Sequence, residues 1–182
     1  MDIFGSVVAI ILFSPIMLFA VIMIKLTSPG PLIYKQERVG LHNHTFMMYK
    51  FRSMEVQSKE SEKKAWTVKN DPRVTGIGKL MRRTSIDELP QLFNILKGDM
   101  SLVGTRPPTL DEWEKYEPHH RARMSFRPGL TGLWQVSGRS NITDFEEVVK
   151  LDTQYIGEWS VKGDIKIILQ TVLGVVKNDG AV

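Results

Sequence analysis

From Val7 to Ile24 the sequence is an apolar run of 18 residues that only Ser14 and Pro15 interrupt. A straight helix of that length reaches ~27 Å, just short of the ~30 Å hydrocarbon core of a bilayer. A cleaved signal peptide is disfavoured, because no basic segment precedes the run and no small-x-small site lies before Lys25. The run therefore predicts a membrane segment, with a buried helix of a soluble protein as the alternative.

Pro15 stands in the middle of this run, where it removes a backbone hydrogen bond and presses against the carbonyl of Ile11. Ser14 can satisfy a freed carbonyl, so a bend is tolerable inside lipid. Two topologies remain open from the residues alone: a helical hairpin that dips into one leaflet, and a kinked span. Basic residues after the run, Lys25, Lys35 and Arg38, place the downstream part on the cytoplasmic side.

The length of 182 residues allows one compact domain with an appendage. We expect a membrane anchor over residues 1–31 and a domain over residues 32–182. The absence of cysteine excludes disulfides and thiolate metal sites. The net charge is +4, and all ten arginines lie between Arg38 and Arg139. Because the planar guanidinium fork suits phosphate, this clustering favours a phosphate-rich ligand.

The domain is expected to be α+β with helices dominant. Residues 32–34 and 45–49 predict short strands, and residues 55–70 a surface loop or helix. Leu89, Leu92, Phe93 and Leu96 follow helical spacing that closes at Gly98. Further helices are expected at residues 112–124, from a capping box of Thr143 and Glu146 to about Ser160, and at residues 164–177 as an amphipathic helix.

Two adjacent carboxylates, Asp87 and Glu88, follow Arg82 and Arg83 at the expected start of a helix. Since Pro90 is tolerated only in a first turn, Asp87 is expected at or near the N-cap. One interpretation is that both carboxylates only stabilise the helix. The other is catalytic: a helix start beside arginines attracts phosphate, a carboxylate can attack phosphorus, and its neighbour can hold Mg²⁺.

Two more segments carry unusual polar residues. The turn of residues 104–108 projects Arg106 from between a glycine and two prolines, a geometry that suits clamping a pyrophosphate. The segment from Arg127 to Arg139 holds three glycines, Trp134 and Gln135 without helical or strand periodicity. We expect this loop to hold a base or a ribose.

Six separated motifs stand in order along the chain: Lys35-Gln36-Glu37-Arg38-Val39-Gly40, Lys50-Phe51-Arg52-Ser53-Met54, Asp71-Pro72-Arg73, Asp87-Glu88-Leu89-Pro90-Gln91, Asp99-Met100-Ser101-Leu102-Val103-Gly104 and the Arg127 loop. Together they resemble the bacterial sugar transferase family. These are the monotopic phosphoglycosyl transferases that prime exopolysaccharide, capsule, O-antigen or glycoprotein glycan assembly. The resemblance covers nearly the whole chain.

The resemblance implies a two-step reaction at a bacterial cytoplasmic membrane. Asp87 attacks the β-phosphate of a UDP-sugar and releases UMP, and the phosphosugar then passes to undecaprenyl phosphate. Glu88 matches the position that binds Mg²⁺. The Ser14-Pro15 break implies a re-entrant hairpin, with the catalytic domain on the cytoplasmic face and amphipathic helices at the membrane surface. The candidate substrate-binding residues are Arg38, Arg52, Asp71, Arg73, Arg82, Arg83, Arg106, Arg127, Gln135 and Arg139.

The expected partners are a UDP-sugar, undecaprenyl phosphate and membrane lipids, without nucleic acid; a homodimer stays open. The rival interpretation is a membrane-anchored, non-catalytic module that uses its arginines to bind anions. The Asp-Glu pair speaks against that module, because it would repel phosphates without a metal. Family members usually carry basic residues before the apolar block. The start at Met1-Asp2-Ile3 therefore leaves open a small member or a trimmed catalytic region. The four histidines, His42, His44, His119 and His120, are interpreted as surface residues.

Overall fold

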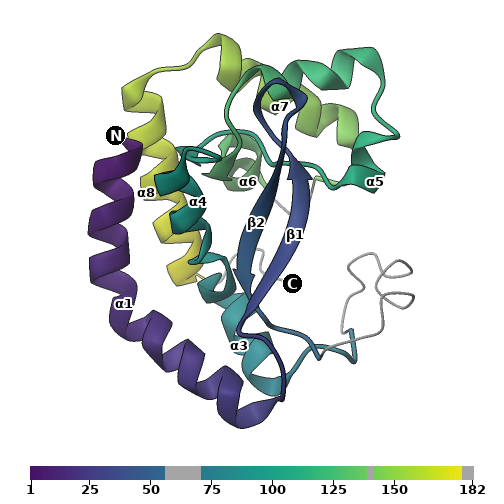
Figure 1. Cartoon of the computed structure of the whole chain (residues 1–182). Coiled ribbons are helices and arrows are strands. Elements are labelled where there is room, and N and C mark those ends of the chain that lie inside the picture. The colour runs from purple at the N-terminus through teal and green to yellow at the C-terminus, as the bar shows by residue number, and fades with distance from the viewer. Residues whose placement is uncertain (56–70, 139–141, 178–182) are drawn as a thin grey trace.

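The computed structural model describes residues 1–55, 71–138 and 142–177 (Figure 1). The expected surface segment of residues 55–70, apart from Glu55, and the candidate Arg139 lie outside the described residues. The described part is an α+β structure in which helices dominate, with two small two-stranded sheets. This confirms the expected α+β class with dominant helices, while the re-entrant hairpin and the helices at the membrane surface stay predictions.

The apolar run forms helix α1 (Asp2–Thr27), with Pro15 inside it. Figure 1 shows that α1 bends near its middle and runs along one side of the molecule. The Ser14 hydroxyl donates a hydrogen bond of 2.8 Å to the Ile11 carbonyl, as the sequence predicted for the carbonyl that faces Pro15. Among the described residues, α1 is the helix that is long and apolar enough to cross a membrane. The hairpin itself stays a prediction.

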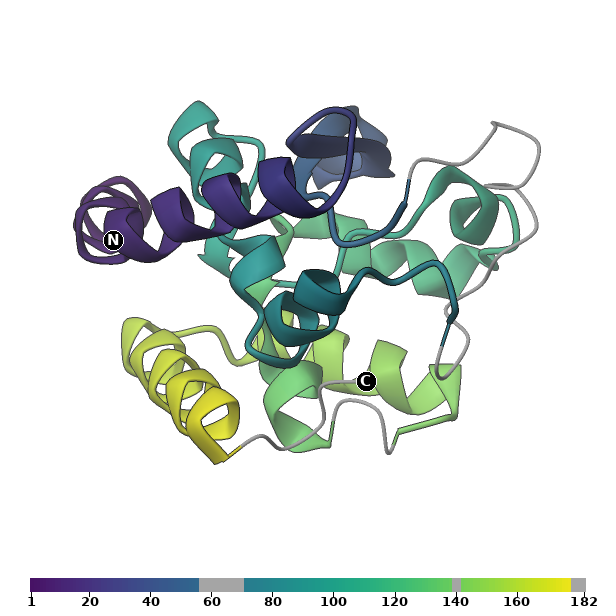
Figure 2. The ribbon, with the colours of Figure 1, turned by 90° about the horizontal axis from the view of Figure 1, so that it is seen from below.

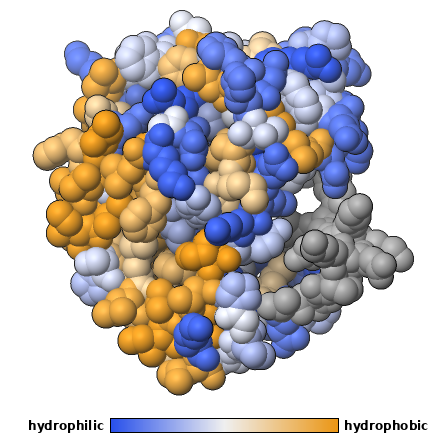
Figure 3. All heavy atoms as spheres, viewed as in Figure 1, coloured by the Kyte–Doolittle hydropathy of each residue, from blue (hydrophilic) through white to orange (hydrophobic). Residues whose placement is uncertain are grey.

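Most of α1 is exposed, and Figure 3 shows apolar side chains gathered over the side of the molecule that α1 forms. The Phe4 side chain, for example, is 79% exposed. The buried face is narrow, and near the end of the helix it holds Ala20 and Ile24, which pack against Phe51 and Met81. The last turns of α1 therefore share a hydrophobic core with the domain that follows.

Strands β1 (Ile33–Val39) and β2 (Thr45–Phe51) form an antiparallel hairpin, with the 3₁₀ turn η1 (Leu41–Asn43) between them. The register pairs Ile33 with Phe51 and Val39 with Thr45. Both strands were expected, but β1 begins one residue later and extends five residues beyond the predicted end at Tyr34. The polar residues 35–38, Lys-Gln-Glu-Arg, hid this extension, because they show none of the apolar alternation by which a strand is recognised.

A second sheet pairs β3 (Ser101–Val103) in parallel with β4 (Gly129–Thr131). The two backbones approach closely at two glycines, Gly104 directly after β3 and Gly129 at the start of β4. A Cβ atom on Gly104 would lie 2.2 Å from the Arg127 carbonyl oxygen, and one on Gly129 would lie 2.1 Å from the Gly104 nitrogen. Only glycine allows this contact, which joins the 104–108 turn to the Arg127 loop.

Along the chain, β2 is followed by α3 (Gly76–Arg83), the 3₁₀ turn η2 (Ile86–Glu88) and α4 (Gln91–Lys97), before β3 begins. Helix α4 closes at Gly98 with φ of 87°, as expected. The helix predicted over residues 112–124 is wrong: this stretch forms α5 (Leu110–Trp113) and the 3₁₀ segment η3 (Pro118–Ser125). Pro118 disfavours a helical conformation at Glu117, which is extended, and so prevents one continuous helix from running through this stretch.

The C-terminal part contains α6 (Leu133–Ser137), α7 (Phe145–Gly157) and α8 (Val161–Lys177). The predicted capping residue Thr143 is wrong. Asp144 occupies the N-cap of α7, and its carboxylate accepts a hydrogen bond of 3.0 Å from the Glu146 amide. Helix α8 begins three residues earlier than expected, and its buried Ile167 packs with Val103 and Tyr155 in a core of its own.

Candidate active site

The two adjacent carboxylates lie in η2, a single 3₁₀ turn between α3 and α4. Ser85, just before it, has a left-handed backbone with φ of 55°, which reverses the chain after α3. The N-cap of α4 is Pro90, so Asp87 lies three residues before the position that the sequence predicted. The N-cap residues of η2 and α4 are Ser85 and Pro90, and neither helix start has a side-chain cap hydrogen bond, so the two carboxylates are not simple helix caps.

Asp87 is buried, with 7% of its surface exposed. Burial, and then the charge of Glu88, raise the pKa of Asp87 from 3.8 to about 6, while Lys50 and Arg82 oppose the shift. The carboxyl is thus ionised near neutral pH yet poorly solvated. A desolvated carboxylate that is held among cations is suited to nucleophilic attack on phosphorus.

Glu88 forms an ion pair of 2.7 Å with the ammonium of Lys50 on β2. Both side chains line a cleft together with the residues Arg38, Met48, Gln91, Arg106, Pro107, Gly129, Leu130 and Gln135. Lys50 was not among the predicted site residues, although it opens one of the six motifs. Its role shows only when β2 is placed against η2.

The carboxylates of Asp87 and Glu88 are hard oxygen donors that suit Mg²⁺, which takes one or two carboxylates and completes its shell with water and substrate phosphates. Glu88 faces the cleft, where a bound phosphate would also lie. The donor set therefore fits the expected ion.

Two guanidinium groups, those of Arg38 and Arg106, line the same cleft. Arg38 is buried and donates to the Gln36 side chain at 2.7 Å and to the Pro107 carbonyl at 3.0 Å. Burial, and then the positive charge of the nearby Arg106, lower the pKa of Arg38 from 12.5 to about 10. A bound anion would reduce the repulsion between these two positive charges, so this part of the cleft is suited to a phosphate.

Gln135 lines the same cleft, and its Oε1 atom is buried without a hydrogen-bond partner among the described residues. A buried acceptor of this kind is costly unless a donor satisfies it. A hydroxyl or N–H of a bound substrate would do so, which fits the prediction that the Arg127 loop contacts a base or a sugar.

The structure brings Glu88, Arg38, Arg106 and Gln135 together in one cleft. Asp87 adjoins this cleft through its chain neighbour Glu88, and the charges of Lys50 and Arg82 both act on its carboxyl.

Three other predicted residues lie elsewhere. Arg127 lines a separate hollow beside the first turns of α1. Arg52 donates to the carbonyls of Ser28 and Pro29 at 2.7 Å each, so it holds the end of α1. Arg83 is exposed at the end of α3.

Asp71 and Arg73 form a local pair in which the Arg73 backbone and side chain both donate to the Asp71 carboxylate. These hydrogen bonds lower the pKa of Asp71 to about 2, and Arg82 contributes to the same shift. The pair therefore lies near Arg82, and neither of its residues lines the cleft. No substrate contact of this pair follows from the geometry.

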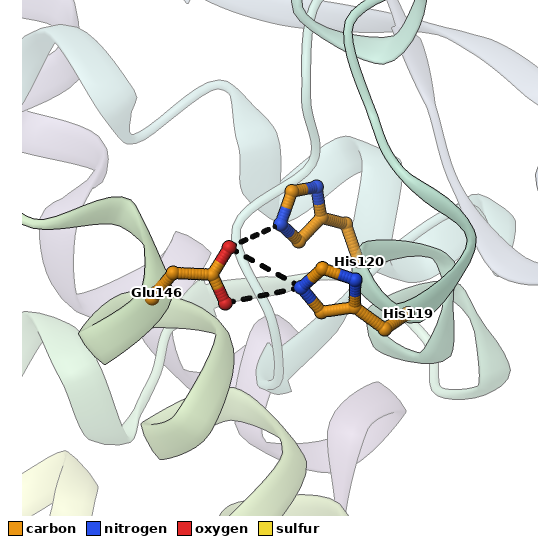
Figure 4. A group of neighbouring side chains, drawn as sticks. All are labelled: His119, His120 and Glu146. Carbon is orange, nitrogen blue, oxygen red and sulfur yellow. Dashed lines mark hydrogen bonds and ion pairs between the residues drawn. The ribbon is translucent and has the colours of Figure 1, made fainter.

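A histidine cluster lies between η3 and the start of α7, where His119, His120 and Glu146 converge (Figure 4). The interpretation of His120 as a surface residue is wrong, since it is buried, whereas the other three histidines are exposed. The Glu117 amide donates to Nδ1 of His120, so in the neutral ring Nε2 carries the hydrogen and donates to Glu146 at 2.7 Å. A metal ion would need the lone pair of that Nε2, which carries the hydrogen here. We therefore interpret the cluster as a set of hydrogen bonds that connects η3 with α7.

Comparisons with known proteins bear on what the cleft does. A family model described as bacterial sugar transferase matches residues 1–178. Galactosyl transferase CpsE of Streptococcus agalactiae serotype III (strain NEM316) is 51% identical over 191 residues, covering 100% of this chain and 42% of the relative. Undecaprenyl-phosphate galactose phosphotransferase of Salmonella typhimurium is 44% identical, covering 99% of this chain and 40% of the relative.

A third relative, the exopolysaccharide production protein PSS of Rhizobium leguminosarum bv. phaseoli, is 41% identical over 182 residues, covering 94% of this chain and 91% of the relative. The chain thus spans about two-fifths of the first two relatives and nearly the whole of the third.

Proposed function

Because this chain belongs to the bacterial sugar transferase family, we propose that it transfers a phosphosugar from a UDP-sugar to undecaprenyl phosphate through a covalent intermediate on Asp87. The relative from Salmonella typhimurium is named as an undecaprenyl-phosphate galactose phosphotransferase. The observation that carries the proposal is the buried Asp87 carboxyl, whose pKa is raised to about 6, next to Glu88 in a cleft that Arg38 and Arg106 also line.

In the first step an oxygen of Asp87 bonds to the β-phosphorus of the UDP-sugar, and the bond from that phosphorus to the bridging oxygen breaks. UMP leaves with the bonding electrons, and the phosphosugar is held as an acyl-phosphate. In the second step a phosphate oxygen of undecaprenyl phosphate attacks the same phosphorus and frees the Asp87 carboxylate. Neither step needs an added water or an oxidant.

Attack of a carboxylate on a diphosphate brings negative charges together, so the site must supply cations. Arg38, Arg106 and Lys50 all line the cleft, and Lys50 is paired with Glu88. Mg²⁺ held by Glu88 would add charge neutralisation at the phosphates. The residues of this chain orient the diphosphate so that its β-phosphorus faces Asp87.

We also propose that α1 re-enters the cytoplasmic leaflet instead of crossing the bilayer. Support comes from both ends of the helix. Asp2 accepts hydrogen bonds from the Ser101 hydroxyl at 2.9 Å and the Leu102 amide at 3.1 Å, both in β3. Arg52 holds the other end through Ser28 and Pro29. A spanning helix would carry Asp2 to the far side of the membrane, away from the domain that binds it.

Helix α8 gives a second apolar surface for the membrane. Figures 1 and 2 both show α8 along the same side of the molecule as α1. Its exposed apolar residues recur at helical spacing, at Val161, Ile165, Leu169, Val172 and Leu173. An amphipathic helix of this type is suited to the membrane interface. The cleft would then lie at headgroup level, where a lipid phosphate and a soluble nucleotide-sugar can both reach it.

The proposal is tested by release of UMP when the protein is mixed with a UDP-sugar, Mg²⁺ and undecaprenyl phosphate. A panel of UDP-sugars in the same assay identifies the sugar. We expect UMP and a lipid-linked phosphosugar in equal amounts. Binding of UDP-sugars without any UMP release across the panel would instead support a non-catalytic anion-binding module.

A further inference from the structure

Arg123, on η3, is a charged residue that is enclosed almost completely, with 2% of its surface exposed. Its Nε and Nη2 atoms both lie 2.7 Å from one carboxylate oxygen of Asp152 on α7. Its Nη1 atom donates to the Tyr116 hydroxyl, and the rings of Tyr116 and Phe145 flank the guanidinium. The side chain therefore has one fixed orientation.

A buried ion pair of this kind is weak evidence for stability, because desolvation of two charges offsets their attraction. Here the cost is larger, since the Oδ1 atom of Asp152 has no hydrogen-bond partner among the described residues. Apolar side chains of similar volume would fill the same space. The role of the pair is therefore better inferred from the backbone that it holds in place than from a contribution to stability.

The pair holds the turn that carries Arg106. The Nη2 atom of Arg123 donates to the Arg106 carbonyl at 3.3 Å. The carbonyl of Arg123 accepts a hydrogen bond of 3.1 Å from the Thr105 hydroxyl. One buried residue thus fixes two consecutive residues of the turn, with its side chain and with its backbone.

The residues that follow Arg106 are fixed from the opposite side, by β1. Arg38 donates to the Pro107 carbonyl at 3.0 Å, and the Val39 amide donates to the Pro108 carbonyl at 3.0 Å. Arg106 therefore lies between two fixed pieces of backbone, while its own side chain is exposed and lines the cleft. A small shift of its carbonyl would be passed on to the guanidinium at the end of a long side chain.

We propose that Arg123, oriented by Asp152, is a positioning residue that fixes the backbone of Arg106 and so directs the Arg106 guanidinium at the substrate phosphates. Arg123 itself is buried under the turn and acts on substrate only through Arg106. The inference rests on the proposed function in that Arg106 is taken to bind a phosphate of the substrate.

The test is a double-mutant cycle between Arg123→Lys and Arg106→Ala. Lysine keeps the charge beside Asp152 but lacks the fork that reaches Tyr116 and the Arg106 carbonyl. We expect kcat/KM for the UDP-sugar to fall roughly 10-fold to 100-fold in the wild-type background, because misplaced groups lose catalytic efficiency steeply. In the Arg106→Ala background the same change should cost less than about 2-fold, since residues that act through one another are non-additive.

Arg121→Lys is the matched control, because Arg121 lies two residues away on the same segment, is exposed and stacks on Trp113 instead of the turn. It should leave kcat/KM unchanged in both backgrounds. An equal loss from Arg123→Lys in both backgrounds would mean that Arg123 supports the fold in general, and it would overturn the positioning role.

If Arg123→Lys does not fold, Thr105→Val enters the cycle in its place, because it removes only the hydroxyl that binds the Arg123 carbonyl. The cycle is also run on calorimetric binding of inorganic pyrophosphate, which needs no turnover. A wild-type protein that binds pyrophosphate but releases no UMP would contradict the proposed function and still decide the role of Arg123. Additive losses of pyrophosphate affinity, or no binding by the wild type, would overturn the inference.

Discussion

At the scale of single residues, the burial of Asp87 has a consequence for stability that is separate from catalysis. A carboxyl whose pKa is higher in the folded than in the unfolded protein binds its proton more tightly when folded. The free energy of unfolding therefore falls as pH rises from the ordinary pKa of 3.8 through the folded pKa of about 6. Above that range, the ionised and buried carboxylate destabilises the folded state.

Asp87→Asn keeps the shape of the side chain and removes this charge. We expect it to raise the free energy of unfolding at neutral pH by on the order of 1–3 kcal/mol, with the difference vanishing near pH 4. Chemical denaturation in detergent across this pH range measures the effect. A variant that is less stable than the wild type at every pH would show that the Asp87 carboxylate is a structural cap.

Glu88 is expected to bind Mg²⁺ at the phosphates, and Glu88→Gln removes the charge while it keeps the size. Activity should fall on the order of 10²-fold and need more Mg²⁺, as it does when a metal shell loses a member. Initial rates against Mg²⁺ concentration after treatment with EDTA give the measurement. If Glu88→Ala is fully active in EDTA, Glu88 has no part in metal binding.

Arg106 and Arg127 were both predicted to bind the substrate, but the structure places them in different hollows. Arg106→Lys keeps the charge and loses the fork, so kcat/KM should fall by roughly 10-fold to 100-fold, equivalent to about 1.5–3 kcal/mol. Arg127→Lys is the natural comparison and should have the smaller effect. Steady-state kinetics with a UDP-sugar decide the matter, and equal activity of Arg106→Lys and the wild type would remove Arg106 from the phosphate site.

At the scale of elements, α1 combines a membrane segment with a structural part of the domain. We expect single cysteines at Ile3 and Leu26, both exposed in the structure, to be shielded from a membrane-impermeant thiol reagent added outside intact cells. These positions leave the Asp2 and Arg52 contacts intact, and the chain has no cysteine of its own. Labelling at Ile3 from outside would establish a single-pass anchor in place of the re-entrant helix.

The elements also show where local sequence patterns suffice. The Ser14 hydrogen bond to Ile11 and the left-handed Gly98 follow from chemistry within one turn, and both were predicted. The helix expected over residues 112–124 was wrong because the prediction gave more weight to the charged composition than to Pro118, whereas the chain is extended at Glu117, just before this proline. The length of strand β1 was underestimated because its polar residues form a strand by pairing with β2. A pattern of neighbouring residues does not show this pairing.

At the scale of the whole molecule, the cleft is assembled from β1, β2, η2, the 104–108 turn and the Arg127 loop. The motifs identified most of its residues, but their grouping required the tertiary structure. Lys50 and Arg123 were missed for this reason: their partners lie 38 and 29 residues away, beyond any periodicity. Arg52 and Arg127 are also arginines, and the sequence alone did not distinguish them from the arginines of the cleft. The fold shows that Arg52 holds the end of α1 and that Arg127 lines another hollow.

The central claim is a covalent phosphosugar on Asp87, and intact-mass measurement tests it most directly. The protein is mixed with a UDP-sugar and Mg²⁺ in the absence of undecaprenyl phosphate, so that the second step cannot occur. We expect one phosphosugar to be added to the wild-type chain, UMP to be released in equal amount, and the adduct to disappear when undecaprenyl phosphate is supplied. Asp87→Asn should show neither adduct nor UMP. Turnover of both substrates without any adduct, or an adduct that persists in Asp87→Asn, would contradict the account.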